Sequence, residues 1–395
     1  MLNLWAEFDN EPSSEESAGR AQHPLPSRRR PTEQAILSSL RDWLLDDYIV
    51  PYSRSLAATR IFRRCYWIDG LGGNPDLQPL VSIAQSLAKE TKPITLRVFA
   101  LEARSSKRKE PKTEHNIAIP KDSGTLRASW PEAAPILLQA IDQSAAIFLL
   151  NPFASSTPFS YEDLSSLYQR TAPTELCMLI SYKQVEARLL PFLRTSDGAS
   201  AFTALLRSDR WKALLTNDAA VDGLIDAFLA SIQQHFLSAQ RIALSMQAGR
   251  ALVAPVPYTL LFATRRQDSL ACMNDAVCLH RRRLYEASHR GVLTEDWFMT
   301  QQREQHAEEM QQLYQGILGQ GRAQRSRRWP DLRQQLLIAQ FGQFTVQDYD
   351  EIICKLLQNG EVRCEWRQKA VDYTETEQRR IPGNDDILLW KPNTH

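Results

Sequence analysis

The sequence predicts an α/β protein built around a Rossmann-like, mostly parallel β-sheet. Short, continuous apolar segments alternate along the chain with segments whose apolar residues recur at helical spacing, which is typical of strand–helix–strand units. Two apolar segments end in an acidic or amide residue followed by glycine or proline, as strands do where a parallel sheet faces a ligand. With 395 residues, 43% of them hydrophobic, the chain is long enough for two or three domains.

The first predicted strand and the turn after it organise the rest of the chain. Apolar residues 65–68 run into Asp69, and Gly70, Gly72 and Gly73 follow directly. Glycine lets a backbone turn sharply and approach a ligand closely. A helix is expected next, and its N–H-rich end would lie beside the same turn. We therefore predict a nucleotide-type binding site here.

Further predicted elements continue the alternation. They follow in the order helix 77–89, strand 94–102, helix 131–142, strand 145–150, helix 161–170 and strand 175–182. The second strand ends at Glu102, and the third is followed by Asn151, Pro152 and Phe153. Because the carboxyl ends of parallel strands lie at one edge of a sheet, we expect these residues to lie close to Asp69.

The remaining segments divide the chain into a central domain and two flanking parts. Residues 1–33 are polar and contain several prolines, which predicts a disordered arm. The central Rossmann-like domain is expected over 34–318, with a helical insertion at about 183–250 before a further strand at 253–264. Residues 319–328 are rich in glycine and arginine and are predicted to form a basic linker.

The C-terminal segment, residues 329–395, is predicted to be a small separate domain. Thr345 with an acid three residues later is typical of a helix start, and short strands are predicted after that helix at 362–366 and 387–390. Helices followed by a β-hairpin are the pattern of a winged-helix domain. We expect that fold here.

Composition excludes several classes of protein. The net charge of +1 gives no overall electrostatic reason to bind nucleic acid, so such a surface has to be local. The six cysteines lack C-x-x-C spacing and the seven histidines lack metal-ligand spacing, so no metal site is predicted. The absence of a signal peptide and of an apolar run of about 18 residues indicates a cytoplasmic protein that does not enter a membrane.

The predicted strand ends carry groups suited to a nucleoside-bearing cofactor. Glu102 offers two acceptor oxygens to a pair of ribose hydroxyls, and the turn glycines would face the rest of the cofactor. Asn151-Pro152-Phe153 resembles the Asp/Asn-Pro-Pro-Tyr/Phe loop of amino-group methyltransferases. In that loop the side-chain oxygen orients the target amine and the aromatic ring stacks on the base. The alternatives are a solvated acid at Glu102 and a turn former at Asn151.

Basic residues gather at three places and are candidate phosphate contacts. They are Arg265 after a predicted strand, Arg281, Arg282 and Arg283 on a predicted helix, and Arg325, Arg327 and Arg328 in the linker. The alternative for each group is a solvated face that carries ion pairs. The linker group lies next to the predicted winged helix, which favours a role in nucleic-acid binding.

The order of these parts resembles the three-Cys-motif partner (TcmP) family of bacteria and mobile elements. The similar segments are Leu40–Tyr48, Trp67–Gly73, Pro79-Leu80, Phe99–Glu102, Leu149–Phe153 and Tyr258–Arg265. The resemblance implies a class I methyltransferase-like fold with a C-terminal winged helix and S-adenosyl-L-methionine (AdoMet) as the cofactor. It also implies a radical-type three-cysteine protein as partner and a setting in phage defence or on mobile elements.

The chain departs from the family pattern Asp-Gly-Phe-Ala-Gly-Pro-Gly within the glycine turn. Leu71 replaces Phe, Gly72 replaces Ala, and Pro75 stands at the last Gly. The family's Asp-Pro-Phe is present as Asn151-Pro152-Phe153. These changes keep the shape of a cofactor site and leave its turnover open.

Two functions from different classes therefore stand. The first is an AdoMet-dependent methyltransferase that acts on nucleic acid, either DNA or RNA. The second is a catalytically lapsed methyltransferase scaffold that binds nucleic acid or a protein partner within a complex. A different α/β enzyme, such as a nuclease or a nucleotide hydrolase, is the remaining alternative. Against a nuclease, the strand ends supply no tight cluster of Asp, Glu and Lys for two metal ions.

Overall fold

The computed structural model describes residues 32–392 except positions 74, 103–121, 156–157, 217–218, 248–252, 290–294, 326 and 368–379. The predicted arm, residues 1–33, lies outside the described residues apart from its last two positions. Those two open the first helix, α1: Thr32 is its N-cap and accepts a hydrogen bond from the backbone N–H of Ala35 at 3.3 Å.

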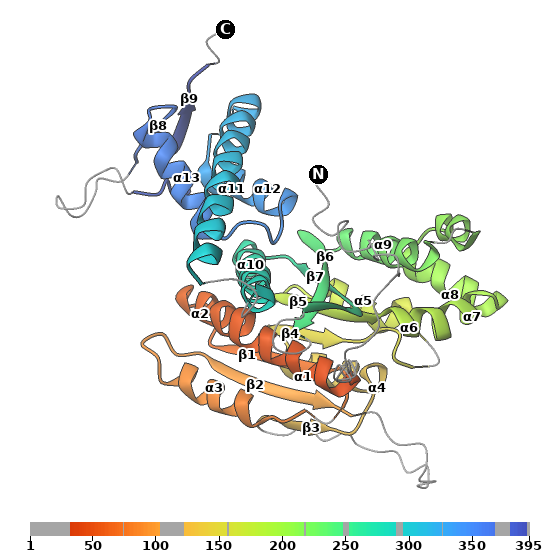
Figure 1. Cartoon of the computed structure of the whole chain (residues 1–395). Helices are drawn as coiled ribbons and strands as arrows, with labels where there is room; N and C mark the ends of the chain where they lie inside the picture. Colours follow the sequence, from red (N-terminus) through yellow and green to blue (C-terminus); the bar gives the residue numbers. More distant parts are fainter. Residues whose placement is uncertain are drawn as a thin grey trace, which may run out of the picture.

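A seven-stranded sheet forms the centre of the molecule (Figure 1), with strand order β3-β2-β1-β4-β5-β7-β6. The strands are β1 (Arg64–Gly70), β2 (Thr95–Leu101), β3 (Gly124–Leu126), β4 (Ala145–Leu150), β5 (Thr174–Ser181), β6 (Ser238–Gln247) and β7 (Val253–Thr264). Strands β1 to β5 run parallel, whereas β7 is antiparallel to both of its neighbours, β5 and β6. The predicted α/β fold with a mostly parallel, Rossmann-like sheet is confirmed.

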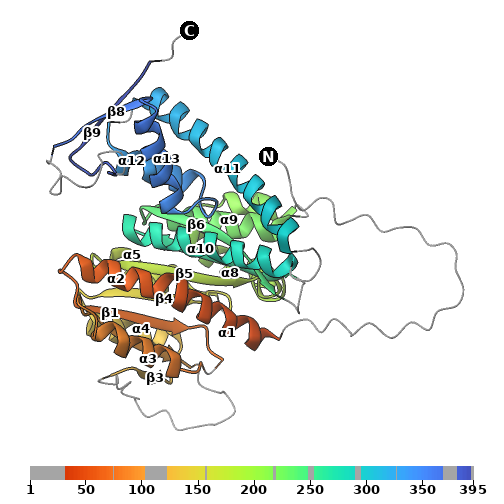
Figure 2. The same cartoon turned by 60° about the vertical axis from the view of Figure 1, so that its left-hand side comes forward.

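Helices cover both faces of this sheet. One face carries α1 (Glu33–Trp43), the π-helix η2 (Leu44–Ile49), α2 (Val50–Ala58), α3 (Gln78–Ala88) and α10 (Gln267–His289). The other carries α4 (Trp130–Ile141), α5 (Tyr161–Gln169), α6 (Tyr182–Gln184), the π-helix η3 (Val185–Leu189), α7 (Leu190–Leu193), α8 (Ser196–Leu206), the 3-10 helix η4 (Arg210–Thr216) and α9 (Ala220–Gln233). Figure 2 shows α1, α2 and α10 side by side along the first face.

Strand β1 illustrates that both faces of the sheet are buried. Its residues alternate between the two cores: Tyr66 and Ile68 pack among α4 and its neighbours, and Cys65 and Trp67 pack beneath α1 and α2. All four side chains are buried. A strand covered by helices on both faces has no polar side, which explains its continuous apolar sequence.

The segment predicted as a helical insertion, about 183–250, contains a strand. Helices fill it up to Gln233, but Ser238–Gln247 forms the edge strand β6. Ile242 and Leu244 are two residues apart and face the same core, which is the period of a strand. The alternation is short and interrupted by polar residues, so helical spacing in the flanking residues obscured it.

The C-terminal elements form a third apolar core. They are α11 (Glu295–Gln324), α12 (Trp329–Ala339), α13 (Val346–Gln358), β8 (Val362–Glu365) and β9 (Ile387–Trp390). The predicted start of α13 is present, since Thr345 Oγ1 accepts from Asp348 N at 3.2 Å and Asp348 Oδ2 accepts from Thr345 N at 2.8 Å. Strands β8 and β9 pair antiparallel. Whether two helices and this hairpin act as a winged helix stays a prediction.

The predicted linker, 319–328, is helical over most of its length, because α11 continues to Gln324. Gly321 does not break the helix. Its missing side chain lets the ring of Trp390 pack against the helix backbone, where a Cβ would lie 2.4 Å from the ring. The glycine therefore serves close packing of the hairpin on α11. Among the described helices, none has both the length and the apolarity needed to cross a membrane.

Candidate functional site

Three predicted strand ends meet at one edge of the sheet. Asp69, near the end of β1, stands in register with Ala100 of β2 on one side and Leu149 of β4 on the other. Glu102 and Asn151 each follow those partners by two residues. The three residues therefore lie at the carboxyl ends of adjacent parallel strands, where open α/β sheets bind their ligands.

The glycine turn after β1 has the conformation that glycine allows. Gly72 and Gly73 have φ angles of +73° and +79°, a region that other residues rarely adopt. Gly70 serves close packing instead, because a Cβ there would lie 2.8 Å from a side-chain atom of Leu150. A Cβ on Gly72 would meet no described atom within 4 Å. On the side of the turn where that Cβ would point, the described part of the chain therefore leaves space.

A buried ion pair closes the inner side of the same turn. The guanidinium of Arg41 donates from Nε to Asp69 Oδ2 at 2.6 Å and from Nη2 to Asp69 Oδ1 at 3.1 Å. The same Nη2 donates to the carbonyl of Gly72 at 2.6 Å, and Leu71 N donates to Asp69 Oδ1 at 3.0 Å. Asp69 is 1% exposed. Both its oxygens are used within the chain, so Asp69 shapes the turn rather than facing a ligand.

The predicted set of site residues omitted Arg41. It lies on α1 within the apolar stripe that faces the sheet, next to Leu37, Leu40 and Leu44. An arginine in such a stripe needs a buried partner, because an unpaired charge there is very unfavourable. The sequence signal was this charge on the apolar face, but nothing in the sequence names its partner, Asp69.

Glu102 is placed differently from Asp69. It is half-exposed, and its backbone N–H donates to the carbonyl of Leu126 at 2.9 Å, which fixes its position beside β3. Its carboxylate makes no hydrogen bond or ion pair to any residue that the structure describes. Glu102 therefore presents a carboxylate at the sheet edge with its acceptor oxygens free of described partners.

Asn151 is buried and its amide is engaged at both ends. Nδ2 donates to Gln184 Oε1 at 3.0 Å, and Oδ1 accepts the backbone N–H of Phe153 at 3.1 Å. The second contact is an Asx-type turn, the alternative that the sequence left open. An amide oxygen has two lone pairs, so Oδ1 keeps one for a further donor.

Phe153 lies inside the core. Its ring is 1% exposed and lies 5.7 Å from the ring of Phe228 on α9. This differs from the expectation that the ring stacks on a target base. The chain turns inward at Pro152, whose carbonyl accepts the N–H of Phe159 at 3.0 Å. Burial of a large apolar ring explains the difference.

The side chains that contact Asp69 and Asn151 both lie on helical segments that include a π-helical stretch. Arg41 lies just before η2, and Gln184 lies directly before η3. π-Helical turns are uncommon and occur often at functional sites. The two helices that hold Asp69 and Asn151 therefore share an irregularity beside the candidate site.

The side chain of Arg265 makes hydrogen bonds within the fold, to backbone carbonyls of other segments. Its guanidinium donates to the carbonyls of His235 at 2.9 Å and of Arg170 and Tyr168 at 2.5 Å, and it lies 4.6 Å from the ring centre of Phe236. Burial lowers the pKa of this guanidinium. These contacts differ from the predicted phosphate contact, because they use the donors that a phosphate would need.

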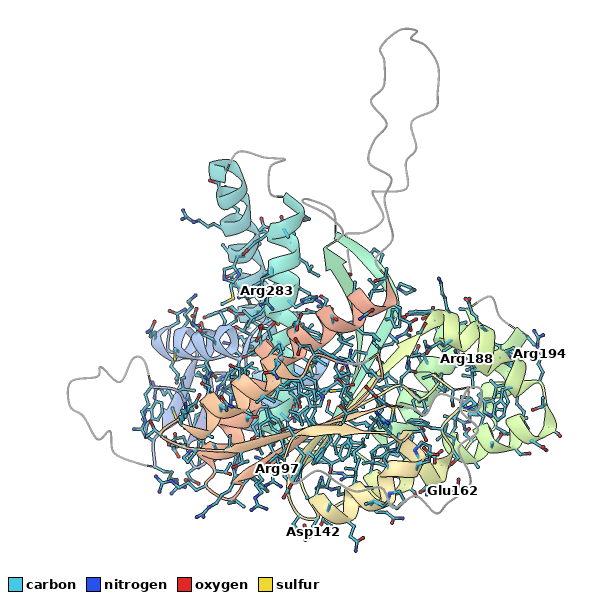
Figure 3. All side chains as sticks on the ribbon, turned by 90° about the horizontal axis from the view of Figure 1, so that it is seen from below. Arg97, Asp142, Glu162, Arg188, Arg194 and Arg283 are labelled. Carbon is cyan, nitrogen blue, oxygen red and sulfur yellow. The ribbon has the colours of Figure 1, made fainter. Side chains whose placement is uncertain are left out.

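The side chains of the three arginines on α10 also contact residues of other elements. Arg282 and Arg283 make ion pairs, and Arg281 donates to a backbone carbonyl. The contacts are Arg281 Nη1 to Gly342 O (2.9 Å), Arg282 Nη2 to Asp348 Oδ2 (2.8 Å) and Arg283 to Asp47. Figure 3 labels Arg283 on its helix. The alternative of ion-paired surface charges therefore describes this group better than phosphate binding does.

Arg325, Arg327 and Arg328 differ from the other basic groups. All three are exposed, and their side chains make no hydrogen bond or ion pair to the described part of the chain. They line two adjoining open hollows beside α12 and β9. Of the seven arginines predicted to contact phosphate, these three have side-chain donors that no described residue uses.

A buried carboxyl at the opposite edge of the sheet was not predicted. Glu175, near the start of β5, accepts hydrogen bonds from Tyr52 Oη at 2.5 Å and Ser269 Oγ at 2.7 Å. Ser269 Oγ also lies 2.9 Å from Tyr48 Oη. Burial raises the pKa of Glu175 to about 7, although these hydroxyl donors oppose the rise. The network ties α2 and α10 to β5.

Comparison of the sequence with protein-family models and with curated proteins gave no match. Within the described residues, no three His, Cys, Asp or Glu side chains are grouped as metal ligands.

Proposed function

We propose that the chain is a class I methyltransferase-like protein whose carboxyl sheet edge binds AdoMet and whose substrate is nucleic acid. The observation that carries the proposal is the strand order. It differs from the dinucleotide-binding order 3-2-1-4-5-6 by an antiparallel β7 between β5 and β6. That insertion is the arrangement of class I methyltransferases, the fold that the resemblance to the TcmP family implies.

In this proposal Glu102 accepts hydrogen bonds from the cofactor's ribose hydroxyls. It is the carboxylate of the edge that no described residue uses, and it follows β2, next to β1. The turn at Gly72, where an added Cβ would meet no described atom within 4 Å, lies beside the rest of the cofactor. Asp69 does not contact the cofactor in this proposal. Its carboxylate positions the guanidinium of Arg41, which in turn donates to the carbonyl of Gly72 and so fixes the turn.

Asn151 is the proposed orienting residue for the target nitrogen. Its Oδ1 already accepts from Phe153 N, which points one lone pair into the turn and leaves the other for an amine. Orientation of the lone pair of the attacking nitrogen toward the methyl group contributes much of the rate in such a transfer. Phe153 supports this geometry through its backbone N–H while its ring anchors the turn in the core.

The second candidate function is a non-catalytic scaffold that binds nucleic acid or a protein partner, such as the three-cysteine protein that the resemblance implies. The engagement of both ends of the Asn151 amide and the burial of the Phe153 ring favour it. Under this alternative, the strand ends are structural and the exposed arginines carry the interaction.

Calorimetric titration of the full chain with AdoMet and with its demethylated product separates the two. The methyltransferase-like proposal predicts micromolar binding that Glu102→Ala abolishes. Glu162→Ala is the matched control, because it removes an exposed carboxylate of α5 to which the proposal assigns no contact with the cofactor (Figure 3). Absence of binding at millimolar AdoMet, with nucleic acid still retained, would support the scaffold instead.

A further inference from the structure

Four arginines surround the junction between α12 and the β8–β9 hairpin. Arg325, Arg327 and Arg328 line a hollow of about 370 Å³ together with Asp331. Arg327 and Arg328 also line an adjoining hollow of about 540 Å³ with Arg367. We call these four residues the arginine cradle.

We infer that the arginine cradle is a phosphodiester-binding surface that anchors nucleic acid on the C-terminal elements, apart from the strand ends. This inference rests on the nucleic-acid partner of the proposed function and assigns that partner to a particular surface. No residue of α13 lines either hollow of the cradle. The exposed residues of α13 include Glu351 and a single lysine, Lys355, so that helix offers phosphates no positive face.

The backbone around the cradle is fixed before any ligand binds. Leu388 N of β9 donates to the carbonyl of Arg327 at 2.7 Å, which joins the start of α12 to the hairpin. The buried carboxylate of Asp386 accepts from Arg367 N at 2.9 Å and from Gly383 N at 2.8 Å. Preorganised groups lose less conformational freedom on binding, which favours affinity.

Trp329, the residue after Arg328, fixes the backbone of the arginines because its side chain is buried in the core. Trp329 is fully buried, and its Nε1 donates to Asp350 Oδ1 at 2.8 Å. Arg333 pairs with the same carboxylate at 2.7 Å. The buried tryptophan fixes the backbone at the start of α12, so Arg327 and Arg328 project from an anchored position while their own guanidinium groups stay unpaired among the described residues.

The chemistry of the cradle fits a phosphate chain better than a single small anion. A guanidinium binds phosphate through a planar fork of donors. Two adjoining hollows share two arginines, and both are open, so neither encloses a small ligand. A nucleic-acid strand presents one charge per roughly 3.4 Å, which supplies successive phosphates to successive hollows.

Acidic residues at the cradle argue against an anionic membrane as the partner. Asp331 lines the first hollow and Asp385 the second, and both are exposed. A flat anionic surface would approach these carboxylates together with the arginines. A polymer in the hollows can contact the arginines and leave the carboxylates to solvent.

The test is fluorescence-anisotropy titration of the full chain with a mixed-sequence DNA duplex of about two helical turns, at several salt concentrations. The double variant Arg327→Ala/Arg328→Ala is expected to bind at least about tenfold more weakly at low salt. Its slope of log affinity against log salt should be less steep by about 2, one unit for each lost phosphate contact. The single strand and an RNA of the same sequence define which nucleic acid binds best.

The matched control is Arg188→Ala/Arg194→Ala, which removes the same charge. Both residues are exposed without described partners, on the helical segment around η3 and α7 (Figure 3). This control should keep the wild-type affinity and slope. Equal weakening by both double variants would overturn the inference, because it would indicate a non-specific charge effect. An unchanged slope in the cradle variant would also overturn it.

Two further readouts separate this inference from the proposed function. AdoMet binding by the cradle variant should equal that of the wild type, whereas Glu102→Ala should keep DNA binding. Vesicles of anionic lipid and inorganic phosphate serve as competing probes. Preferential binding of vesicles over DNA, or equal competition by inorganic phosphate at low millimolar concentration, would contradict a phosphodiester surface.

Discussion

The guanidinium of Arg41 and the carboxylate of Asp69 form a two-point ion pair beneath the glycine turn, with Nε and Oδ2 2.6 Å apart. Asp69 occupies the position at which the sequence predicted a ligand contact. The pair instead joins α1 to the end of β1 and, through Gly72 O, to the turn itself. The turn is thus held from inside, and on its outer side a Cβ at Gly72 would meet no described atom within 4 Å.

Removing one member of this pair should be costly. Arg41→Met leaves Asp69 buried and unpaired, so we expect the free energy of unfolding to fall by about 3–5 kcal/mol in urea denaturation. The double variant Arg41→Met/Asp69→Leu removes both charges and should recover most of that loss. A single variant that costs less than about 1 kcal/mol would contradict the role of the pair.

Asn151 should matter for transfer and not for cofactor binding. Asn151→Ala removes the proposed acceptor for the target amine, so AdoMet affinity should stay within about twofold while methyl transfer is lost. Transfer is measured from labelled AdoMet to mixed-sequence duplex DNA, single-stranded DNA and RNA. Asn151→Asp keeps an acceptor oxygen and should retain activity. Unchanged transfer by Asn151→Ala would refute the assignment.

Asn274 should control how firmly the C-terminal elements dock on α10. Its fully buried amide accepts from Gly342 N and donates to Phe344 O, both at 2.8 Å. Asn274→Ala leaves two buried backbone groups unpaired, and each costs about 1–3 kcal/mol. Hydrogen exchange at residues 342–344 should become faster. Asn274→Asp keeps the acceptor for Gly342 N, so the Gly342 amide should exchange more slowly in this variant than in Asn274→Ala. Unchanged exchange in both variants would contradict this.

Gly342→Ala tests the same docking from the other side. The residue has a φ of +72°, and an added Cβ would lie 2.5 Å from Val277 Cγ1 on α10. Strain and clash together should destabilise the fold by about 1–3 kcal/mol, measured by thermal or urea denaturation. Gly319→Ala is the control, since a Cβ there meets no described atom within 4 Å. Equal effects of the two substitutions would contradict the account.

Glu175 should make stability depend on pH in a defined window. Its pKa is raised from 4.5 to about 7, so between these values the native state holds a proton that the unfolded state has lost. The free energy of unfolding therefore decreases as pH rises through this window, by on the order of 3 kcal/mol. Glu175→Gln, which stays neutral, should match the wild type near pH 4.5 and be more stable at pH 8. A difference independent of pH would contradict this.

The sequence predicted elements whose signal is local. Strands β1, β4 and β5 are continuous apolar runs, and the capping pair Thr345–Asp348 marks the start of α13. Their positions follow from propensity and period alone. The meeting of Asp69, Glu102 and Asn151 also followed, because parallel strands bring their carboxyl ends to one edge.

What the sequence did not predict depends on tertiary partners. Arg41 and Asp69 lie far apart in the chain, and nothing local links them. The arginines of α10 looked like a basic patch because their partners, including Asp47 and Asp348, come from other elements. Gly321 looked like a helix breaker, since the ring that packs on it belongs to Trp390. Charge and glycine patterns thus located contacts without identifying them.

The central claim is that the edge formed by β1, β2 and β4 is the small-molecule site. The most direct measurement is a crystal structure of the full chain with the demethylated product of AdoMet at saturating concentration. We expect ligand density beside Gly72, with the ribose hydroxyls within hydrogen-bond distance of the Glu102 carboxylate. Density at another surface, or side chains packed over this edge with no ligand, would contradict it.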